Sequence, residues 1–223
     1  MSAIVLCKFQ SRTRSAPTVA KSLSAQGRYS VRMNYLAHLY LADRADADMA
    51  GAILGDFVRG PDMTRFAPAI AHSIRLHRRI DTITDQHPLV LGAMARFEPG
   101  PRRYAPIILD VLWDYVLATD WARYSSEPYA DFCSRGARAV AASGSLFEWP
   151  RRPTHSGFTT LLRSYATETG IDFALRRIAA RLKKPEPMLE ACKGWQQHAP
   201  ALREELPALI GDLESAAKAF TTS

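Results

Sequence analysis

The chain has 223 residues, 47% of them hydrophobic, which predicts one large domain with a core that needs no disulfide. No apolar run approaches the roughly eighteen residues of a membrane-spanning helix. Six basic and no acidic residues lie in residues 1–32, which leaves 23 basic and 22 acidic residues in a nearly neutral body, so the net charge of +7 does not indicate a nucleic-acid-binding protein.

Residues 1–32 are rich in Ser, Ala and Arg and show no hydrophobic periodicity, which predicts a disordered basic extension. Their composition also resembles an organellar transit peptide. We favour a simpler interpretation, in which translation starts at Met33 and the preceding segment is an upstream extension of the gene model. Met33 opens directly onto the first expected helix, and the domain is expected to span residues 33–220.

From Met33 onward the pattern is helical, without the alternation of strands, and predicts a single all-α domain. The first helix is capped by Asn34, the second by Asp46 or Asp48, and Pro200 and Pro207 are expected to break the last. The expected helices cover about residues 35–41, 49–58, 68–85, 89–97, 104–121, 129–142, 156–167, 171–182, 186–192 and 195–220.

The helix at 68–85 carries the strongest chemical signal. His77, Asp81 and Asp85 recur every four residues, so their side chains share one face. Neighbouring isoleucines indicate that this face points inward, where an imidazole and two carboxylates need a positive partner such as a divalent metal. The alternative is a solvated face on which the acids pair with Arg78 and Arg79.

A second pair of acids lies on the helix at 104–121. Asp110 and Asp114 are the only charged residues of an otherwise apolar stretch, four residues apart. Two buried carboxylates cannot both stay ionised without a cation, either a metal or an arginine such as Arg59 or Arg78. Alternatively, one acid is a buried hydrogen-bond acceptor between helices and the other lies at a surface edge.

Two further stretches contribute candidate residues. His38 lies on an apolar helix, where a histidine is more often a core residue than a ligand. Asp56 and Arg59 lie at the C-terminal end of the next expected helix. An acid there is disfavoured by the helix dipole and needs a cation, and Arg59 can bind a phosphate or simply compensate the helix end.

Together the four stretches predict a metal site of imidazoles and carboxylates, which suits Mn²⁺, Mg²⁺ or Fe. Such a site activates water and polarises a phosphoryl oxygen. No Gly-x-Ser-x-Gly elbow is present, and Cys7, Cys133 and Cys192 are scattered without the spacing of a zinc knuckle or a disulfide framework. Three such cysteines fit a reducing compartment, here the cytoplasm.

The same stretches resemble the acyl carrier protein phosphodiesterase family, a divergent branch of the His-Asp (HD) metal-dependent phosphohydrolases. The matching motifs are Met-Asn-Tyr-Leu-Ala-His-Leu at 33–39, Gly-Asp-Phe-Val-Arg-Gly at 55–60, His-Arg-Arg-Ile-Asp-Thr-Ile-Thr-Asp at 77–85 and Leu-Asp-Val-Leu-Trp-Asp at 109–114. The resemblance implies an all-α, HD-like bundle that removes 4′-phosphopantetheine from holo-acyl carrier protein with a divalent metal, usually manganese. The adjacent His-Asp pair that names the superfamily is absent, because Arg78 follows His77.

The resemblance also implies roles for the candidate residues. The expected metal ligands are His38, Asp56, His77, Asp110 and Asp114. The expected catalytic residues are Asp81 and Asp85, one of which accepts a proton from the attacking water, and Arg59 and Arg78, which bind the phosphate. His87 is a weaker candidate that can simply end its helix beside Pro88.

The implied partner, an acidic carrier protein, requires a basic surface on this chain. The alternative for the candidate basic residues is that they only form a solvated helix face. Neither a nucleic acid nor a membrane is expected as a partner. The alternatives in function are an HD-type hydrolase of a small phosphate ester or nucleotide, a carrier-binding module without catalysis, and a helical scaffold without metal. The candidate basic residues are Arg151, Arg152, Arg176, Arg177, Arg181, Lys183 and Lys184.

Overall fold

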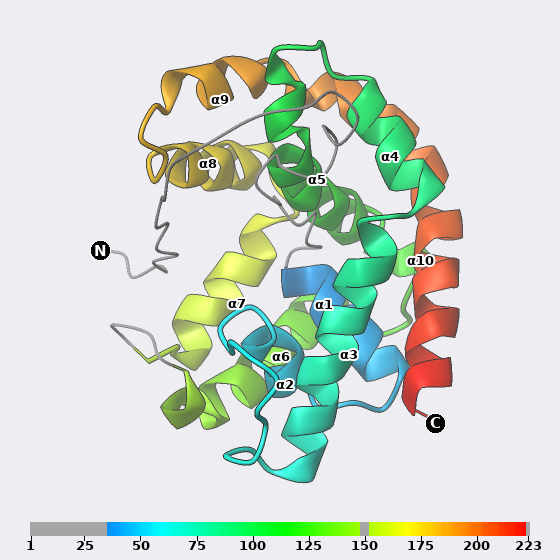
Figure 1. The fold of residues 1–223 in the computed structure, drawn as a ribbon, viewed down its shortest axis with the longest axis vertical. Coiled ribbons are helices and arrows are strands. Elements are labelled where there is room, and N and C mark those ends of the chain that lie inside the picture. Colours follow the sequence, from blue (N-terminus) through cyan, green and yellow to red (C-terminus); the bar gives the residue numbers. More distant parts are fainter. Residues whose placement is uncertain (1–34, 148–151, 222–223) are drawn as a thin grey trace, which may run out of the picture.

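The computed structural model describes residues 35–147 and 152–221, and within these ranges the chain is helical and contains no strand (Figure 1). The predicted all-α class is confirmed. The expected extension at 1–32, the cap Asn34 and the basic residue Arg151 lie outside the described residues. The α-helices of the described residues are α1 (Tyr35–Arg44), α2 (Met49–Leu54), α3 (Pro68–Thr84), α4 (Pro88–Ala95), α5 (Ala105–Thr119), α6 (Tyr129–Ala142), α7 (His155–Ser164), α8 (Glu168–Ala179), α9 (Glu186–Ala191) and α10 (Ala199–Thr221).

Short 3₁₀ helices add to these at Pro101–Tyr104, Trp121–Arg123, Gly144–Leu146 and Trp195–His198. None of the helices in the described ranges is long and apolar enough to cross a membrane.

Helix α5 lies at the centre of the fold. It is buried on almost every side, as its composition predicts, and α1, α8 and α10 pack around it. In Figure 1, α10 runs along one side of α1 and α3, and α6 and α7 lie together on the other. The buried apolar side chains of the described residues form one continuous core, so these helices are a single packed unit.

Helix α10 differs from its prediction. Pro200 lies in its first turn and Pro207 inside it, yet the helix runs unbroken from Ala199 to Thr221. An internal proline costs about 3 kcal/mol. Five leucine or isoleucine side chains buried on one face of α10 outweigh this cost, since each contributes about 1.5–3 kcal/mol. They are Leu202, Leu206, Leu209, Ile210 and Leu213.

Helices α2 and α3 pack against each other more closely than side chains of ordinary size allow. A Cβ atom at Gly51 would lie 2.7 Å from the Ser73 Cβ and 2.8 Å from the Ile70 carbonyl oxygen. Ser73 also donates a hydrogen bond to the Asp48 carbonyl oxygen at 2.6 Å. The Asp48 side chain in turn accepts a bond of 2.7 Å from the Gly51 amide, which makes it the cap of α2. This close packing brings the end of α2 next to the middle of α3.

Candidate metal centre

Three candidate residues meet where α1 and α3 face each other. His38 comes from α1, and His77 and Asp81 come from successive turns of α3. One ligand atom from each lies within 4.8 Å of the others. The His38 Nε2 atom is 3.3 Å from Asp81 Oδ1, and the His77 Nε2 atom is 3.3 Å from Asp81 Oδ2. Asp81 therefore faces both imidazoles, one with each oxygen.

The two imidazole rings stack on each other, with centroids 3.9 Å apart and planes 27° apart. Both histidines are 2% exposed, and the Asp81 side chain is 14% exposed. Both rings turn their Nε2 atom toward the Asp81 carboxylate, so the possible ligand atoms lie close together. Asp81 is the most exposed of the three residues and lies on the solvent side.

Asp56 adds a fourth side chain at the edge of this cluster. It lies in the turn after α2, which ends at Leu54, four residues earlier than the predicted helix. The Asp56 Oδ1 atom is 3.5 Å from His77 Nε2. The close packing of α2 on α3 thus places Asp56 beside His77.

The cluster has the chemistry of a divalent metal site. The Nε2 atoms of His38 and His77 and the Oδ1 atom of Asp81 are buried without a hydrogen-bond partner among the described residues. Two atoms bound to one ion at about 2.1 Å lie about 3.0–3.4 Å apart at octahedral or tetrahedral angles. The observed separations of 3.3 Å match this spacing, and two imidazoles with a carboxylate are a usual donor set for a divalent ion.

The electrostatics of the cluster separate its two histidines. Burial lowers the pKa of His77, but the nearby carboxylates of Asp56 and Asp81 outweigh it and raise the pKa to about 9. Burial and the neighbouring His77 lower the pKa of His38. Burial acts to raise the pKa of Asp81, but both histidines hold it well below its usual range. Asp81 therefore stays ionised and ready to bind a cation.

Gly55 forms the wall behind His77, which the sequence analysis does not anticipate. A Cβ atom at this position would lie 2.2 Å from the His77 Cγ and 2.3 Å from its Cδ2. The backbone of Gly55 is ordinary right-handed helix, with φ −49° and ψ −35°, so it does not need glycine for its conformation. The absent side chain instead leaves room for the imidazole ring. The spacing of Gly51 and Gly55 by one helix turn is the only sequence signal of this packing.

The resemblance implies a metal-binding role for Asp114, and the contacts of Asp114 match the alternative of a buried hydrogen-bond acceptor between helices. It is fully buried, and its two oxygens accept bonds of 2.9 and 3.0 Å from the backbone amides of Leu36 and Ala37. These amides belong to the first turn of α1, where the helix itself offers no carbonyl oxygen to accept their hydrogen bonds. Asp114 thus anchors the start of the helix that carries His38, and it is not part of the three-residue cluster.

Replacing Asp114 with Ala is expected to lower the free energy of unfolding by about 2–4 kcal/mol. The substitution leaves two buried amides without an acceptor, each at a cost of about 1–3 kcal/mol. Asp114→Asn keeps one acceptor oxygen and is expected to lose about half as much. Urea unfolding of the unaltered protein and the two variants tests this order of stability. The prediction is contradicted if Asp114→Asn is as destabilising as Asp114→Ala.

The other two candidate acids lie outside the three-residue cluster as well. Asp110 is one turn before Asp114 on α5 and is partly exposed. Burial, with Asp114 and Asp110 among the nearby charges, raises the pKa of Tyr165. Asp85 is partly buried just after α3, one turn beyond Asp81, and its amide donates to the Asp81 carbonyl oxygen at 2.9 Å.

Arg78 supports the loop that carries Arg59. Its Nη2 atom donates to the Val58 carbonyl oxygen at 2.7 Å, and its Nη1 atom donates to that of Gly60 at 2.8 Å. Arg59 lies between these two carbonyls and is exposed. The expected phosphate contact thus suits Arg59, which Arg78 positions.

His87 caps a helix. It precedes α4, and its Nδ1 atom accepts a bond from the Leu89 amide at 3.2 Å. Its Nε2 atom lies 3.2 Å from Asp212 Oδ2 on α10. His87 is expected, as one alternative, to end the preceding helix; in the structure it is the N-terminal cap of the next helix, α4.

The free energy of unfolding of the chelator-treated protein is expected to fall as the pH rises from 6.5 to 9. Protonated His77 stabilises the fold. This contribution is complete when the pH is below 6.5, the ordinary pKa of histidine, and it is lost as the pH rises through the raised pKa of about 9. Burial raises the pKa of Asp114 from 3.8 to about 8, although the hydrogen bonds from Leu36 and Ala37 act to lower it. The free energy of unfolding therefore also falls as the pH rises toward 8.

Each unit of pKa difference corresponds to about 1.4 kcal/mol. Urea unfolding at a series of pH values measures how steeply the free energy of unfolding falls with pH. This slope is expected to be shallower for His77→Gln, because only the contribution of Asp114 remains. An equal slope in both proteins would contradict this origin.

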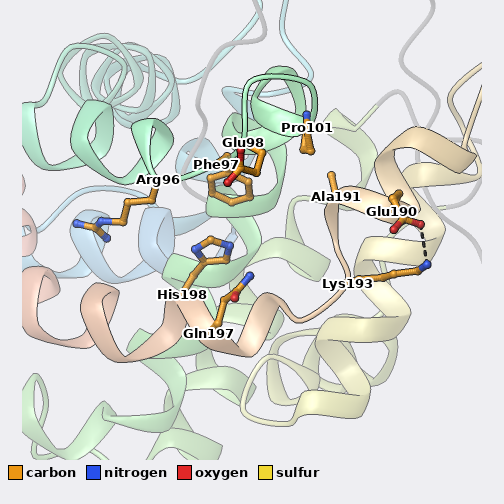
Figure 2. Close-up of a pocket in the computed structure, with 9 residues that line it drawn as sticks. All are labelled: Arg96, Phe97, Glu98, Pro101, Glu190, Ala191, Lys193, Gln197 and His198. Carbon is orange, nitrogen blue, oxygen red and sulfur yellow. Dashed lines mark ion pairs between the residues drawn. The ribbon is translucent and has the colours of Figure 1, made fainter.

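A pocket of about 430 Å³ lies between the end of α4, the 3₁₀ helix at Pro101–Tyr104, α9 and the 3₁₀ helix at Trp195–His198 (Figure 2). None of the candidate residues lines it. The rings of Phe97 and His198 stack there with centroids 4.3 Å apart. Lys193 pairs with Glu190 at 2.6 Å, so the charge of this lysine is compensated within the pocket wall.

A family model described as acyl carrier protein phosphodiesterase matches residues 33–213. No solved structure matches the chain.

Curated relatives with the same description include proteins of three bacteria. The protein of Photorhabdus laumondii is 46% identical over 40% of this chain and 45% of its own length. That of Enterobacter sp. is 46% identical over 49% and 57%, and that of Yersinia enterocolitica is 49% identical over 40% and 46%. The matched part spans about half the length of these relatives.

Proposed function

This chain belongs to the acyl carrier protein phosphodiesterase family, and from that membership we propose that it hydrolyses the phosphodiester between 4′-phosphopantetheine and the serine of holo-acyl carrier protein. The products are apo-acyl carrier protein and free 4′-phosphopantetheine. The observation that carries the proposal is the buried cluster of His38, His77 and Asp81, whose ligand atoms have the spacing and the unmet bonding of a metal site. We also propose a cytoplasmic location, which the free cysteines Cys133 and Cys192 support.

We propose manganese as the ion, because imidazole nitrogens and a carboxylate suit Mn²⁺, with Fe²⁺ and Mg²⁺ as the alternatives. A bound ion would supply positive charge to the phosphoryl oxygen and lower the pKa of a water molecule. His38, His77 and Asp81 would hold it, and Asp56 lies beside His77 as a further ligand.

Asp85 is the better of the two expected proton acceptors. Asp81 faces both histidines, which hold the pKa of its carboxyl well below its usual range and make it a weak base. Asp85 is the C-terminal cap of α3, one turn beyond Asp81, so we assign it the proton of the attacking water while Asp81 stays a ligand.

Arg59 is suited to bind the anionic oxygens of the phosphodiester. It is exposed on the loop after Asp56, and Arg78 holds the carbonyls on either side of it. A fixed guanidinium at this position would neutralise charge that builds up on the phosphoryl group in the transition state.

The test is a mass measurement of holo-acyl carrier protein incubated with the purified protein and Mn²⁺, with chelator as the control. Loss of the 4′-phosphopantetheine mass only with metal supports the proposal. An unchanged mass with a folded, metal-loaded protein overturns it, and small phosphate esters and nucleotides become the next substrates to test.

The variant Asp85→Asn is expected to keep its Mn²⁺ affinity and lose about 10²–10³-fold in kcat in this assay, the usual contribution of a general base. Weaker metal binding in this variant would instead make Asp85 a ligand.

A further inference from the structure

The end of α8 and the turn after it carry a run of basic residues. Between Asp172 and Glu186 the chain has five basic residues and no acidic one. None of the five forms an ion pair with a described residue, whereas cations elsewhere, such as Arg135 and Arg203, face carboxylates. The five are Arg176, Arg177, Arg181, Lys183 and Lys184. Their positive charge is therefore available to a partner.

An exposed aromatic ring lies within this surface. Phe173 is 56% exposed, the most of the large hydrophobic side chains in the described ranges. The guanidinium of Arg177 lies over its ring, 5.4 Å from the centroid. Arginine and aromatic side chains are enriched at protein interfaces and often dominate their energetics.

Two arginines of this surface crowd each other. Arg177 lies in the last turn of α8 and Arg181 lies just beyond the end of that helix, and burial and the charge of Arg177 lower the pKa of Arg181. The two positive charges repel each other, and neither arginine forms an ion pair with a carboxylate of a described residue. An acidic partner would remove this repulsion on binding.

The surface extends toward the metal centre. Tyr35 is among the groups that act electrostatically on Arg181, and its ring lies 5.6 Å from that of Phe158 on α7, the helix that packs on α8. Tyr35 is the first residue of α1, one turn before His38. Helix α8 also packs on α5, whose Asp114 anchors that same turn (Figure 1). A protein bound at the end of α8 would thus sit beside the helix that carries a metal ligand.

We propose that Phe173 and the five basic residues form a docking surface, here called the α8 patch, for the acidic face of the acyl carrier protein. The charge complementarity and the nearness to α1 support this partner. The proposal rests on the proposed function for the identity of the partner. Binding and hydrolysis are separate steps, so each can be tested without the other.

The test measures binding of fluorescently labelled apo-acyl carrier protein, which has no phosphodiester to cleave, by anisotropy. The double variant Arg177→Glu, Arg181→Glu is expected to bind at least 10-fold more weakly than the unaltered protein. The matched control is Arg138→Glu, which reverses an exposed charge on α6, outside the patch, and is expected to bind normally. Affinity of the unaltered protein is expected to fall as salt is raised.

Equal affinity of the double variant and the unaltered protein overturns the proposal, and so does an equal loss in the Arg138→Glu control or no binding by the unaltered protein. With holo-acyl carrier protein the double variant should raise KM at least 10-fold and leave kcat unchanged. Failure of hydrolysis alone, with charge-dependent binding of the apo form, would overturn the proposed function but not the docking surface.

Discussion

Replacing Asp81 with Asn is expected to abolish Mn²⁺ binding and to lower kcat on holo-acyl carrier protein by about 10³-fold or more. The Asp81 oxygens lie 3.3 Å from His38 Nε2 and from His77 Nε2, so this one carboxylate completes the ligand set on both sides. Asn keeps the shape of the side chain but removes its charge and replaces one oxygen with an NH₂ group, which cannot bind a metal.

Calorimetric titration with Mn²⁺ and the mass assay measure the two effects. The matched control is Asp62→Asn, an exposed acid on the loop before α3, which is expected to leave both unchanged. If Asp81→Asn still bound Mn²⁺ with its original affinity, the three-residue cluster would not be the metal site.

Replacing Gly55 with Ala is expected to lower the free energy of unfolding by about 1–3 kcal/mol and to weaken Mn²⁺ binding by about 10–100-fold. The new Cβ would lie 2.2 Å from the His77 Cγ, so either the ring or the end of α2 must move. The ring is buried and stacked on His38, and a shift would carry its Nε2 atom away from Asp81.

Two other glycines provide controls. Gly92→Ala on α4 introduces a Cβ with no atom within 4 Å and is expected to stabilise the protein by about 0.5–1 kcal/mol. Gly51→Ala meets Ser73 and the Ile70 carbonyl, so it is expected to destabilise α2 on α3 without direct contact with His77. Weak Mn²⁺ binding specific to Gly55→Ala supports a steric role in positioning His77. Unchanged binding in a destabilised Gly55→Ala would contradict it.

The sequence was most informative about local patterns. The face shared by His77 and Asp81 follows from a four-residue spacing on a helix, and the central position of α5 follows from an apolar composition on every side. Such patterns are local, because helix periodicity fixes which side chains share a face before any tertiary contact forms.

The same patterns left the roles of the remaining candidates open. Asp114 and Asp81 are both inward-facing acids four residues from another acid, yet Asp81 meets two histidines and Asp114 meets the first amides of α1. Arg78 is expected on the phosphate, and its guanidinium donates to the loop carbonyls on either side of Arg59, a contact that its own helix does not reveal. The partner of each side chain comes from a different helix, so its spacing along its own helix cannot specify it.

By itself, the sequence determined that the described chain is helical, which faces turn inward and which residues carry metal-binding chemistry. Only the tertiary structure decided which of these residues meet, because that depends on how closely the helices approach. The absence of a side chain at Gly51 and Gly55 lets α2 approach α3, and the anchoring of α1 by Asp114 on α5 brings His38 to Asp81. Packing distances between helices are set by side-chain volumes on both surfaces, and one helix's sequence holds only half of that information.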